Sequence, residues 1–523
     1  MSEMIFQQNQ DRRIIENKNF LQKAERLLPR LKETIVHPVQ IVDVVPDDEI
    51  IHGWKTKHIH SIEKLPDLTF GKKDQIILDF DNHQVGYLSL HIKPVGSPPD
   101  APLHLKITFG EMPVEVAEDF STYNGIISSA WLQEEFIHMD VLPGILNLER
   151  RYSFRYVKIE VLATSPKYKV CFNNIVCKSV SSADTAVVSK LENSDLLLKR
   201  IDEVSIKTLV DCMQEVFEDG PKRDRRLWLG DLRLQALANY ATVTNNDLVK
   251  RCLYLFAGTP DDKGRIAANL FIKPAVIADD TYFTDYSLFF MDTLVDYYKE
   301  TKDTETLIEL WPIAFKQIEN ALKSVDTNNL LKGEGFFAFI DWAEGLEKET
   351  AAQGILIYIM KKALSIAEIV NKEHAMFLED KIPLLVEASK KHLWDSNTGL
   401  FISGENKQIS YASQVWMILA GVPSTVEAQC ILRKLSTVSA IEPSTPYMYH
   451  HLVEAYIVAG EKETAVEKIK EYWGEMLKDG ADTFWELYNP KDKTFSPYGG
   501  YLINSYCHAW SCTPTYLIRK YNL

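Results

Sequence analysis

Asp219-Gly-Pro-Lys-Arg-Asp-Arg-Arg-Leu-Trp-Leu-Gly-Asp231 is the stretch that decides how this chain is interpreted, since it holds three carboxylates, four basic groups and a tryptophan. Gly220 and Pro221 favour a sharp turn. Apolar residues recur at helical spacing after Asp231, so we expect this residue to be the N-cap of a helix. Acids beside a flat aromatic ring suit a carbohydrate-cleaving site, although a solvated connecting loop has a similar composition.

The overall composition is that of an ordinary globular protein with an acidic surface. At 523 residues, 46% hydrophobic and 25% charged, the chain is too long for one core, and two or three domains are expected. A net charge of -15 argues against nucleic acid or an anionic membrane as the main partner, whereas a neutral sugar fits. The sequence has no apolar run long enough for a membrane span and no signal-peptide core, so we expect a cytoplasmic protein.

The cysteines and histidines form no strong metal or disulfide motif. The seven cysteines are scattered without a Cys-x-x-Cys pair, which indicates reduced thiols. His58-Ile-His60 is a weak metal signal, and an exposed strand face explains it better. We therefore expect no metal and no other cofactor.

The first part of the chain, residues 1–185, has the alternating pattern of β-structure. An amphipathic helix is predicted over 17–34. Short alternating runs then follow, separated by Pro, Gly, Asn and Asp, which is typical of an antiparallel β-sandwich. The predicted strands are 75–79, 86–92, 103–109, 154–160 and 167–176.

From about residue 186 to 523, apolar residues recur every three or four positions, which predicts helices. A strict sequence repeat is missing, which disfavours a fixed-period solenoid. Ten to twelve paired helices are compatible with a closed ring of helical hairpins. The predicted helices are 188–213, 231–257, 282–301, 304–325, 350–372, 374–393, 425–437, 447–459, 463–477 and about 502–521.

Four more clusters of acids and aromatics lie at breaks in the helical pattern, so each could lie on the same rim of a helical ring. Core packing or helix capping explains any one of them alone. Four clusters of one chemistry, together with the 219–231 turn, favour a sugar site. The clusters are 279–286, 336–345, 482–488 and 506–510.

At these residues the chain resembles glycoside hydrolase family 78, the α-L-rhamnosidases. The 219–231 stretch is similar to the acidic turn and Trp-x-Gly-Asp element of that family, and Gly480–Glu486 is similar to its Trp-Glu element. Weaker matches extend the resemblance from about residue 75 to the end. They are 78–87, 109–111, 152–156, Asp285-Tyr286-Ser287, Asp341-Trp342 and His508.

The resemblance implies an all-α (α/α)6 barrel as the catalytic domain, following the N-terminal antiparallel β-sandwich. It further implies an inverting mechanism with Asp224 as general acid and Glu486 as general base. The positions that it assigns to rhamnose binding or to the pocket wall are Asp219, Arg223, Trp228, Asp231, Asp285, Tyr286, Asp341, Trp342, Trp485 and His508.

Two departures from the family pattern concern the acidic turn. Asp224 stands where the family usually has Glu, and Gly-Pro-Lys replaces Cys-Pro-Gln. Arg223, Arg225 and Arg226 would lower the pKa of Asp224 if all pointed at it, so we expect at least two to point elsewhere.

The favoured function is removal of terminal α-L-rhamnose from small rhamnose-containing glycosides. Two alternatives stay open at this point: an α/α-barrel glycosidase or lyase that acts on another sugar, and a non-catalytic sugar-binding relative. A homodimer is compatible with a chain of this size.

Overall fold

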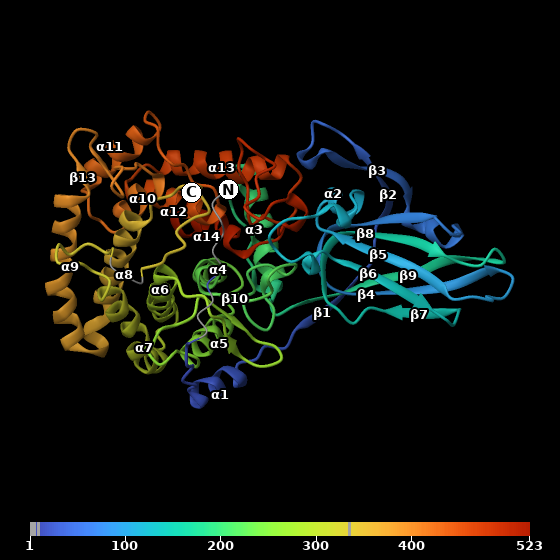
Figure 1. Cartoon of the computed structure of the whole chain (residues 1–523), viewed down its shortest axis with the longest axis horizontal. Coiled ribbons are helices and arrows are strands. Elements are labelled where there is room, and N and C mark those ends of the chain that lie inside the picture. The colour runs from blue at the N-terminus through green and yellow to red at the C-terminus, as the bar shows by residue number, and fades with distance from the viewer. Residues whose placement is uncertain (1–6, 8–10, 333–335) are drawn as a thin grey trace.

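The computed structural model describes residue 7, residues 11–332 and residues 336–523. Strands fill the region up to Ser181, and helices dominate from Leu196 onward. The two parts lie end to end along the long axis of the molecule (Figure 1). This arrangement confirms the predicted fold class, an antiparallel sheet domain followed by a helical domain.

The sheet domain consists of antiparallel strands in one hydrogen-bonded network, with the central order β1-β9-β4-β8-β5-β6. Strands β2 and β3 pair with each other, and β2 and β7 each pair with β4. The strands are β1 (Lys32–Val36), β2 (Gln40–Pro46), β3 (Trp54–Ser61), β4 (Gln75–Gly96), β5 (Leu103–Gly110), β6 (Glu134–Met139), β7 (Gly144–Asn147), β8 (Tyr152–Ala163) and β9 (Tyr168–Ser181).

The long strand β4 belongs to both layers of the sheet domain. Its first half, up to Gly86, pairs with β8, and its second half pairs with β9. The sheet therefore folds over on itself around one apolar core, built from alternate residues of β4, β5, β8 and β9. At the crossing, a Cβ on Gly86 would lie 2.3 Å from the carbonyl oxygen of Lys178, so only glycine fits.

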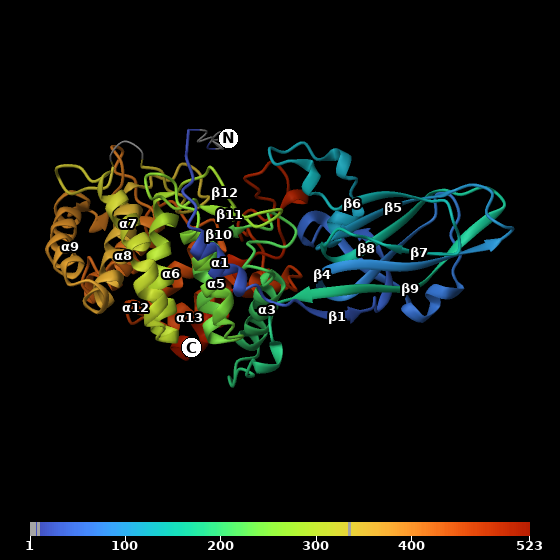
Figure 2. The ribbon, with the colours of Figure 1, turned by 90° about the horizontal axis from the view of Figure 1, so that it is seen from below.

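The predicted N-terminal helix is shorter than expected, and it packs on the helical domain. Helix α1 spans Lys18–Arg26, and the chain then extends into β1. Pro29 explains the early end, because proline disfavours helix at the residue before it. Phe20 of α1 packs 5.6 Å from the ring of Tyr254, and Figure 2 shows α1 beside α5 in the helical part of the molecule.

Twelve helices, α3 to α14, form the helical domain in the described part of the chain. The even-numbered helices contact one another in succession from α4 to α12, and α14 contacts α4, so they form an inner ring. The helices are α3 (Leu196–Cys212), α4 (Leu229–Ala241), α5 (Asn246–Ala257), α6 (Thr284–Thr301), α7 (Thr304–Leu322), α8 (Glu349–Val370), α9 (Lys372–His392), α10 (Tyr411–Leu419), α11 (Thr425–Leu435), α12 (Pro446–Val458), α13 (Lys462–Lys478) and α14 (Pro514–Tyr521).

The inner helices α4 and α12 are buried on nearly all sides, which is why their hydrophobic pattern is weakly amphipathic. Every residue of α4 from Leu229 to Asn239 is buried. Outer helices such as α9 bury only one face. Within the described residues, no helix is both long and apolar enough to cross a bilayer.

Several predicted helix limits were wrong. The 231–257 helix is two helices, α4 and α5, separated by a turn in which Thr244 has a φ of 56°. Over 502–521, only α14 is α-helical, because Pro514 begins it and the preceding residues form irregular loops. Helix α10 was missed.

Asp231 is not the N-cap of α4. The helix begins at Leu229 with Trp228 at the cap position, and Asp231 lies in the first turn. The reason is tertiary: strand β10 (Leu227–Trp228) pairs with β11 (Asn269–Phe271), which keeps the backbone extended only up to Trp228.

Candidate active site

The predicted site residues gather at the N-terminal ends of the inner helices. Trp228 precedes α4, Asp285 opens α6, and His508 lies a few residues before α14. Contacts between these segments, described below, bring them together, and the exposed N–H groups of helix starts favour polar ligands there. The acid and aromatic clusters therefore meet at one end of the helical ring.

The acidic turn folds around the carboxylate of Asp219. Its Oδ2 accepts a 2.9 Å hydrogen bond from the backbone N–H of Asp224, and its Oδ1 accepts one of 3.0 Å from Arg226. The peptide between Arg223 and Asp224 is cis. Gly220 is required in this turn, because a Cβ there would lie 2.4 Å from the carbonyl oxygen of Arg223. Asp219 thus holds the backbone that presents Asp224.

Burial and charge together perturb Asp219. The residue is 4% exposed. Desolvation, reinforced by the nearby charge of Asp224, raises the pKa of Asp219 to about 7. The Asp224 side chain is more open, with 20% of it exposed. The turn therefore pairs a buried carboxyl that resists ionisation with one that a ligand can reach.

Glu486 is held in place by three groups. Its carboxylate accepts hydrogen bonds from the Arg223 guanidinium and from the Tyr498 hydroxyl, and a longer one of 3.4 Å from the Ser505 N–H. Its own N–H donates to the carbonyl of Ser505 at 3.0 Å. The side chain is buried, which fixes its direction.

Arg223 links the two predicted catalytic carboxylates. Its Nη1 lies 3.8 Å from Oδ1 of Asp224, while its Nη2 bonds to Glu486. The other two arginines of the turn point elsewhere, as expected. Arg225 Nε donates to the carbonyl of Pro221 at 2.8 Å, and the Arg226 guanidinium lies 4.4 Å from the ring centre of Phe271.

Asp231 and His508 form a second polar pair in the site. His508 Nε2 lies 3.1 Å from Asp231 Oδ1, and both side chains are buried. Burial alone would lower the pKa of His508, but Asp231 and Glu486 raise it above its ordinary value. Within the described residues, the buried Nδ1 of His508 has no hydrogen-bond partner.

Aromatic rings surround these polar groups. Trp228 packs edge-on against Tyr286 at 6.2 Å, and Trp342 packs edge-on against Tyr498 at 5.9 Å. Trp228 and Trp342 are half-buried, whereas Tyr286 is buried. The two tryptophans therefore present apolar surface on which a sugar ring could pack.

Two of the predicted binding acids use their oxygens on backbone and hydroxyl groups of the protein. Asp285 accepts hydrogen bonds from the N–H groups of Phe339 and Ile340, at 3.1 and 2.9 Å. Asp341 accepts from the Ser444 N–H at 2.9 Å and from the Thr445 hydroxyl at 2.6 Å. Burial raises the pKa of Asp341 to about 6. These contacts fix the loop that carries Trp342.

Trp485 lies deeper than a pocket wall would. It is 2% exposed and packs edge-on against Tyr488 and Tyr506, at 5.7 and 5.4 Å. In this position it anchors the segment next to Glu486.

Sequence reasoning missed two contributors to the site, Tyr498 and Lys222. Tyr498 bonds to Glu486, and Lys222 lies fully buried beside Arg223. The loop Ser496-Pro-Tyr498-Gly-Gly follows the Trp-Glu element, and its Pro and Gly residues were the available signal that it turns back on the site.

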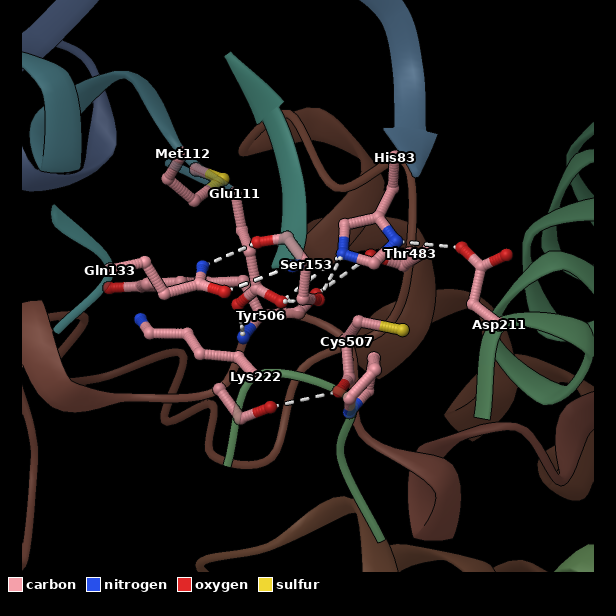
Figure 3. Close-up of polar contacts among 12 residues, drawn as sticks. His83, Glu111, Met112, Gln133, Ser153, Asp211, Lys222, Thr483, Tyr506 and Cys507 are labelled. Carbon is pink, nitrogen blue, oxygen red and sulfur yellow. Dashed lines mark hydrogen bonds and ion pairs between the residues drawn. The ribbon is translucent and has the colours of Figure 1, made fainter. Parts of the chain in front are cut away.

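One group of side chains in the described residues has the spacing of metal ligands: His83, Asp211 and Cys507, at the contact between the two domains (Figure 3). Its polar atoms are already used. His83 Nδ1 lies 2.6 Å from Asp211, its Nε2 lies 2.9 Å from the Ser153 hydroxyl, and Lys207 also bonds to Asp211. The group is therefore a closed hydrogen-bond network, to which a competing ammonium is bound.

The fold and site together define a class of protein. Two carboxyl groups near one guanidinium, with tryptophans beside them at one end of a ring of helical hairpins, supply the paired acids and apolar surface that a glycoside hydrolase needs.

Comparison with known families narrows the class. The model of the glycosyl hydrolase family 78 alpha-rhamnosidase N-terminal domain matches residues 38–179. The model of the bacterial alpha-L-rhamnosidase 6 hairpin glycosidase domain matches residues 186–521. The chain therefore belongs to glycoside hydrolase family 78 and is an α-L-rhamnosidase by family. A search of curated proteins found no match.

Solved structures agree with this assignment. A rhamnosidase from Klebsiella oxytoca with rhamnose bound is 45% identical, covers 98% of this chain and 100% of its own, and has a TM-score of 0.96. A family 78 rhamnosidase of Bacillus sp. GL1 is 20% identical over 90% of this chain and 50% of its own, with a TM-score of 0.73. One from Dictyoglumus thermophilum is 15% identical over 94% and 52%, with a TM-score of 0.68. The last two show the fold alone.

Proposed function

We propose that this chain removes terminal α-L-rhamnose from small glycosides by an inverting mechanism, with Asp224 as general acid and Glu486 as general base. The observation that carries the proposal is the position of these two carboxyl groups on either side of the Arg223 guanidinium. Inverting enzymes hold such a pair about 6.5–9.5 Å apart, with room for a water molecule. The width of one guanidinium plus a contact at each end is compatible with that range.

Each carboxyl group has surroundings that suit its proposed role. Asp224 is the more exposed of the two, so it can reach the glycosidic oxygen and donate its proton to the leaving group. Glu486 is oriented by Arg223 and Tyr498, so it can hold a water molecule and take a proton from it as the new bond forms.

The sugar itself would be held by the remaining groups of the site. Asp231 and His508 offer hydrogen bonds to hydroxyl groups, and Trp228 and Trp342 offer apolar faces to the ring and its methyl group. The Klebsiella oxytoca neighbour was solved with rhamnose bound, which supports this ligand. Glu486 and His508 are both under 5% exposed, which is compatible with a site that takes the end of a sugar chain.

The stereochemistry of the product tests the mechanism. The purified protein is incubated with 4-nitrophenyl α-L-rhamnoside, and the sugar that is released first is followed by NMR. Release of the β-anomer is expected, since water attacks from the face opposite the leaving group. Release of the α-anomer would mean that Glu486 acts as a nucleophile or that another residue does.

Replacing the proposed base tests its role separately. Glu486→Gln keeps the size and most hydrogen bonds of the side chain but cannot accept a proton. We expect kcat to fall by about 10²-fold or more, with folding and rhamnose binding retained. A variant with near-full kcat would remove Glu486 from the mechanism. Comparing a rhamnose disaccharide with a rhamnose polymer as substrates tests the preference for small glycosides.

A further inference from the structure

A layer of buried charged side chains lies between the sheet domain and the helical domain. Figure 3 shows Lys222 of the acidic turn in this layer, near Glu111 of the sheet domain and Tyr506 of the helical domain. Lys222 is 0% exposed. A fully buried ammonium is costly unless it is paired and hydrogen-bonded, so its partners show what it holds together.

Lys222 bonds to three acceptors from two different segments. Its ammonium donates to the carboxylate of Glu115, and to the carbonyl oxygens of Leu502 and Asn504 at 3.1 and 2.8 Å. Three acceptors match the three N–H groups of a lysine ammonium. The side chain therefore joins the acidic turn, the sheet domain and the 502–504 segment at one point.

The 502–504 segment leads directly to the proposed base. Arg223 Nε donates to the carbonyl of Ile503 at 2.9 Å, between the two carbonyls that Lys222 uses. The next residue, Ser505, accepts a hydrogen bond at its carbonyl from the N–H of Glu486, and its own N–H donates to the Glu486 carboxylate. Lys222 therefore fixes the acidic turn against the segment that holds Glu486.

On the other side of the ammonium, Glu115 is itself held rigidly. Its Oε2 accepts hydrogen bonds from the N–H groups of Glu111 and Met112, at 2.8 and 2.9 Å, at the start of the short helix α2 (Pro113–Ala117). Oε2 of Glu111 in turn accepts a 2.7 Å hydrogen bond from the N–H of Tyr506. The sheet domain thus holds the Glu115 carboxylate in one position, and Lys222 places the acidic turn against it.

We propose that Lys222 and Glu115 are positioning residues that set Asp224 against Glu486, so that the sheet domain takes part in catalysis through one buried ion pair. The inference rests on the roles proposed above for those two carboxyl groups. Lys222 and Glu115 are both fully buried and are assigned no contact with the substrate. They act by holding the backbone on both sides of the site.

The test uses the full chain with Lys222→Met, Glu115→Gln and the double variant. Each is assayed with 4-nitrophenyl α-L-rhamnoside and with methyl α-L-rhamnoside, whose leaving group needs full protonation. We expect kcat to fall by about 10²-fold on the methyl glycoside for each single variant. The loss on the nitrophenyl glycoside should be about tenfold smaller, because a misplaced acid matters less there. KM should change little.

The double variant separates positioning from stability. Removing both charges avoids an unpaired buried ion, so its Tm should recover toward that of the wild type. The ratio of kcat on the two substrates should stay altered, since the acidic turn, the sheet domain and the 502–504 segment are no longer joined through Lys222. If the ratio returns to the wild-type value together with Tm, the pair serves stability alone and the proposal is wrong. Glu115→Gln keeps the side-chain volume and carries the test if Lys222→Met does not fold.

A matched control is available three residues away. Glu118 of the sheet domain accepts a 2.8 Å hydrogen bond from Tyr501 but, among its contacts in the described residues, has none to the acidic turn. Glu118→Gln should leave the substrate ratio unchanged, and an equal change of the ratio would overturn the proposal. Asp224→Asn and Glu486→Gln are measured in parallel. If they retain activity, the proposed function fails; if only the Lys222 and Glu115 variants behave like Glu118→Gln, this inference alone fails.

Discussion

Arg223 and Glu486, which are 263 residues apart in sequence, form a buried ion pair in the candidate active site. Burial alone would lower the pKa of the Arg223 guanidinium. The nearby Glu486 carboxylate outweighs this effect and raises the pKa above its ordinary value, so the group stays charged. Its other end faces Asp224 at 3.8 Å. One cation thus orients the proposed base and lies within contact of the proposed acid, which explains how a short turn and a distant loop can act together.

Asp224→Asn should affect substrates according to their leaving groups. Asparagine keeps the shape of the side chain but cannot donate a proton to the glycosidic oxygen. We expect kcat on methyl α-L-rhamnoside to fall by about 10²–10⁴-fold, while 4-nitrophenyl α-L-rhamnoside loses much less. Steady-state kinetics on both substrates measure this difference. Equal losses on both would remove Asp224 from the acid role.

Asp219→Asn should make stability less dependent on pH. The pKa of Asp219 is raised from its unfolded value near 4 to about 7, so the folded protein binds this proton more tightly than the unfolded chain. Stability from this group is therefore greatest at low pH and is lost as pH rises from about 4 to 7. The Tm of the variant relative to the wild type should increase over that window.

Calorimetry or thermal fluorescence between pH 4.5 and 8 provides the comparison. Asp341→Asn is a useful reference, because burial also raises the pKa of Asp341, to about 6. Its effect on Tm should therefore change over a lower pH window than that of Asp219→Asn. A Tm difference that does not change with pH would show that Asp219 is ionised throughout.

The alternation of strands and the helical periodicity were enough to predict both domains, because each element buries a face that repeats along the sequence. The predicted ends of helices were wrong where tertiary contacts determine them. Strand β10 keeps the chain extended up to Trp228, and no local feature of the sequence shows that it pairs with residues near 270. Pro29 was a local signal that should have ended the first helix earlier.

Only those parts of the site that form a local sequence motif or an acid-rich segment could be predicted. The acidic turn and Glu486 are recognisable in the sequence, but their connection through Tyr498 and Arg223 depends on chain closure over hundreds of residues. The contact of Lys222 with Glu115 spans 107 residues and joins two domains. Asp285 and Asp341 show the opposite case, since the acid-rich pattern does not reveal that their oxygens bond to backbone and hydroxyl groups.

Gly230→Ala should displace an aromatic residue of the site. A Cβ on Gly230 would lie 2.4 Å from Cζ of Tyr286, although the helical backbone itself accepts alanine. Overpacking of this kind costs about 1–3 kcal/mol, so a lower Tm is expected. Because Tyr286 packs against Trp228, KM for the rhamnoside should also rise.

The double variant Gly230→Ala/Tyr286→Leu provides the check. Leucine removes the ring atoms that clash with the new methyl group, so Tm should partly recover. The wall beside Trp228 would still be altered, and KM should stay high. If Tm does not recover, the clash with Tyr286 is not the source of the loss.

His508→Gln should remove a pH dependence that the ion pair with Asp231 creates. The pKa of His508 is raised by Asp231 and Glu486 despite the opposing effect of burial. The stabilisation from its charge is therefore fully present below the unfolded pKa of about 6.5, and it is lost as pH rises through the higher folded value. The Tm advantage of the wild type over the variant should shrink over that range.

KM of the wild type should rise over the same range. The variant should have a nearly constant KM, about tenfold higher than the low-pH value of the wild type. Parallel pH profiles of KM for the two proteins would show that His508 is neutral in the folded enzyme and that its contact with Asp231 contributes without charge.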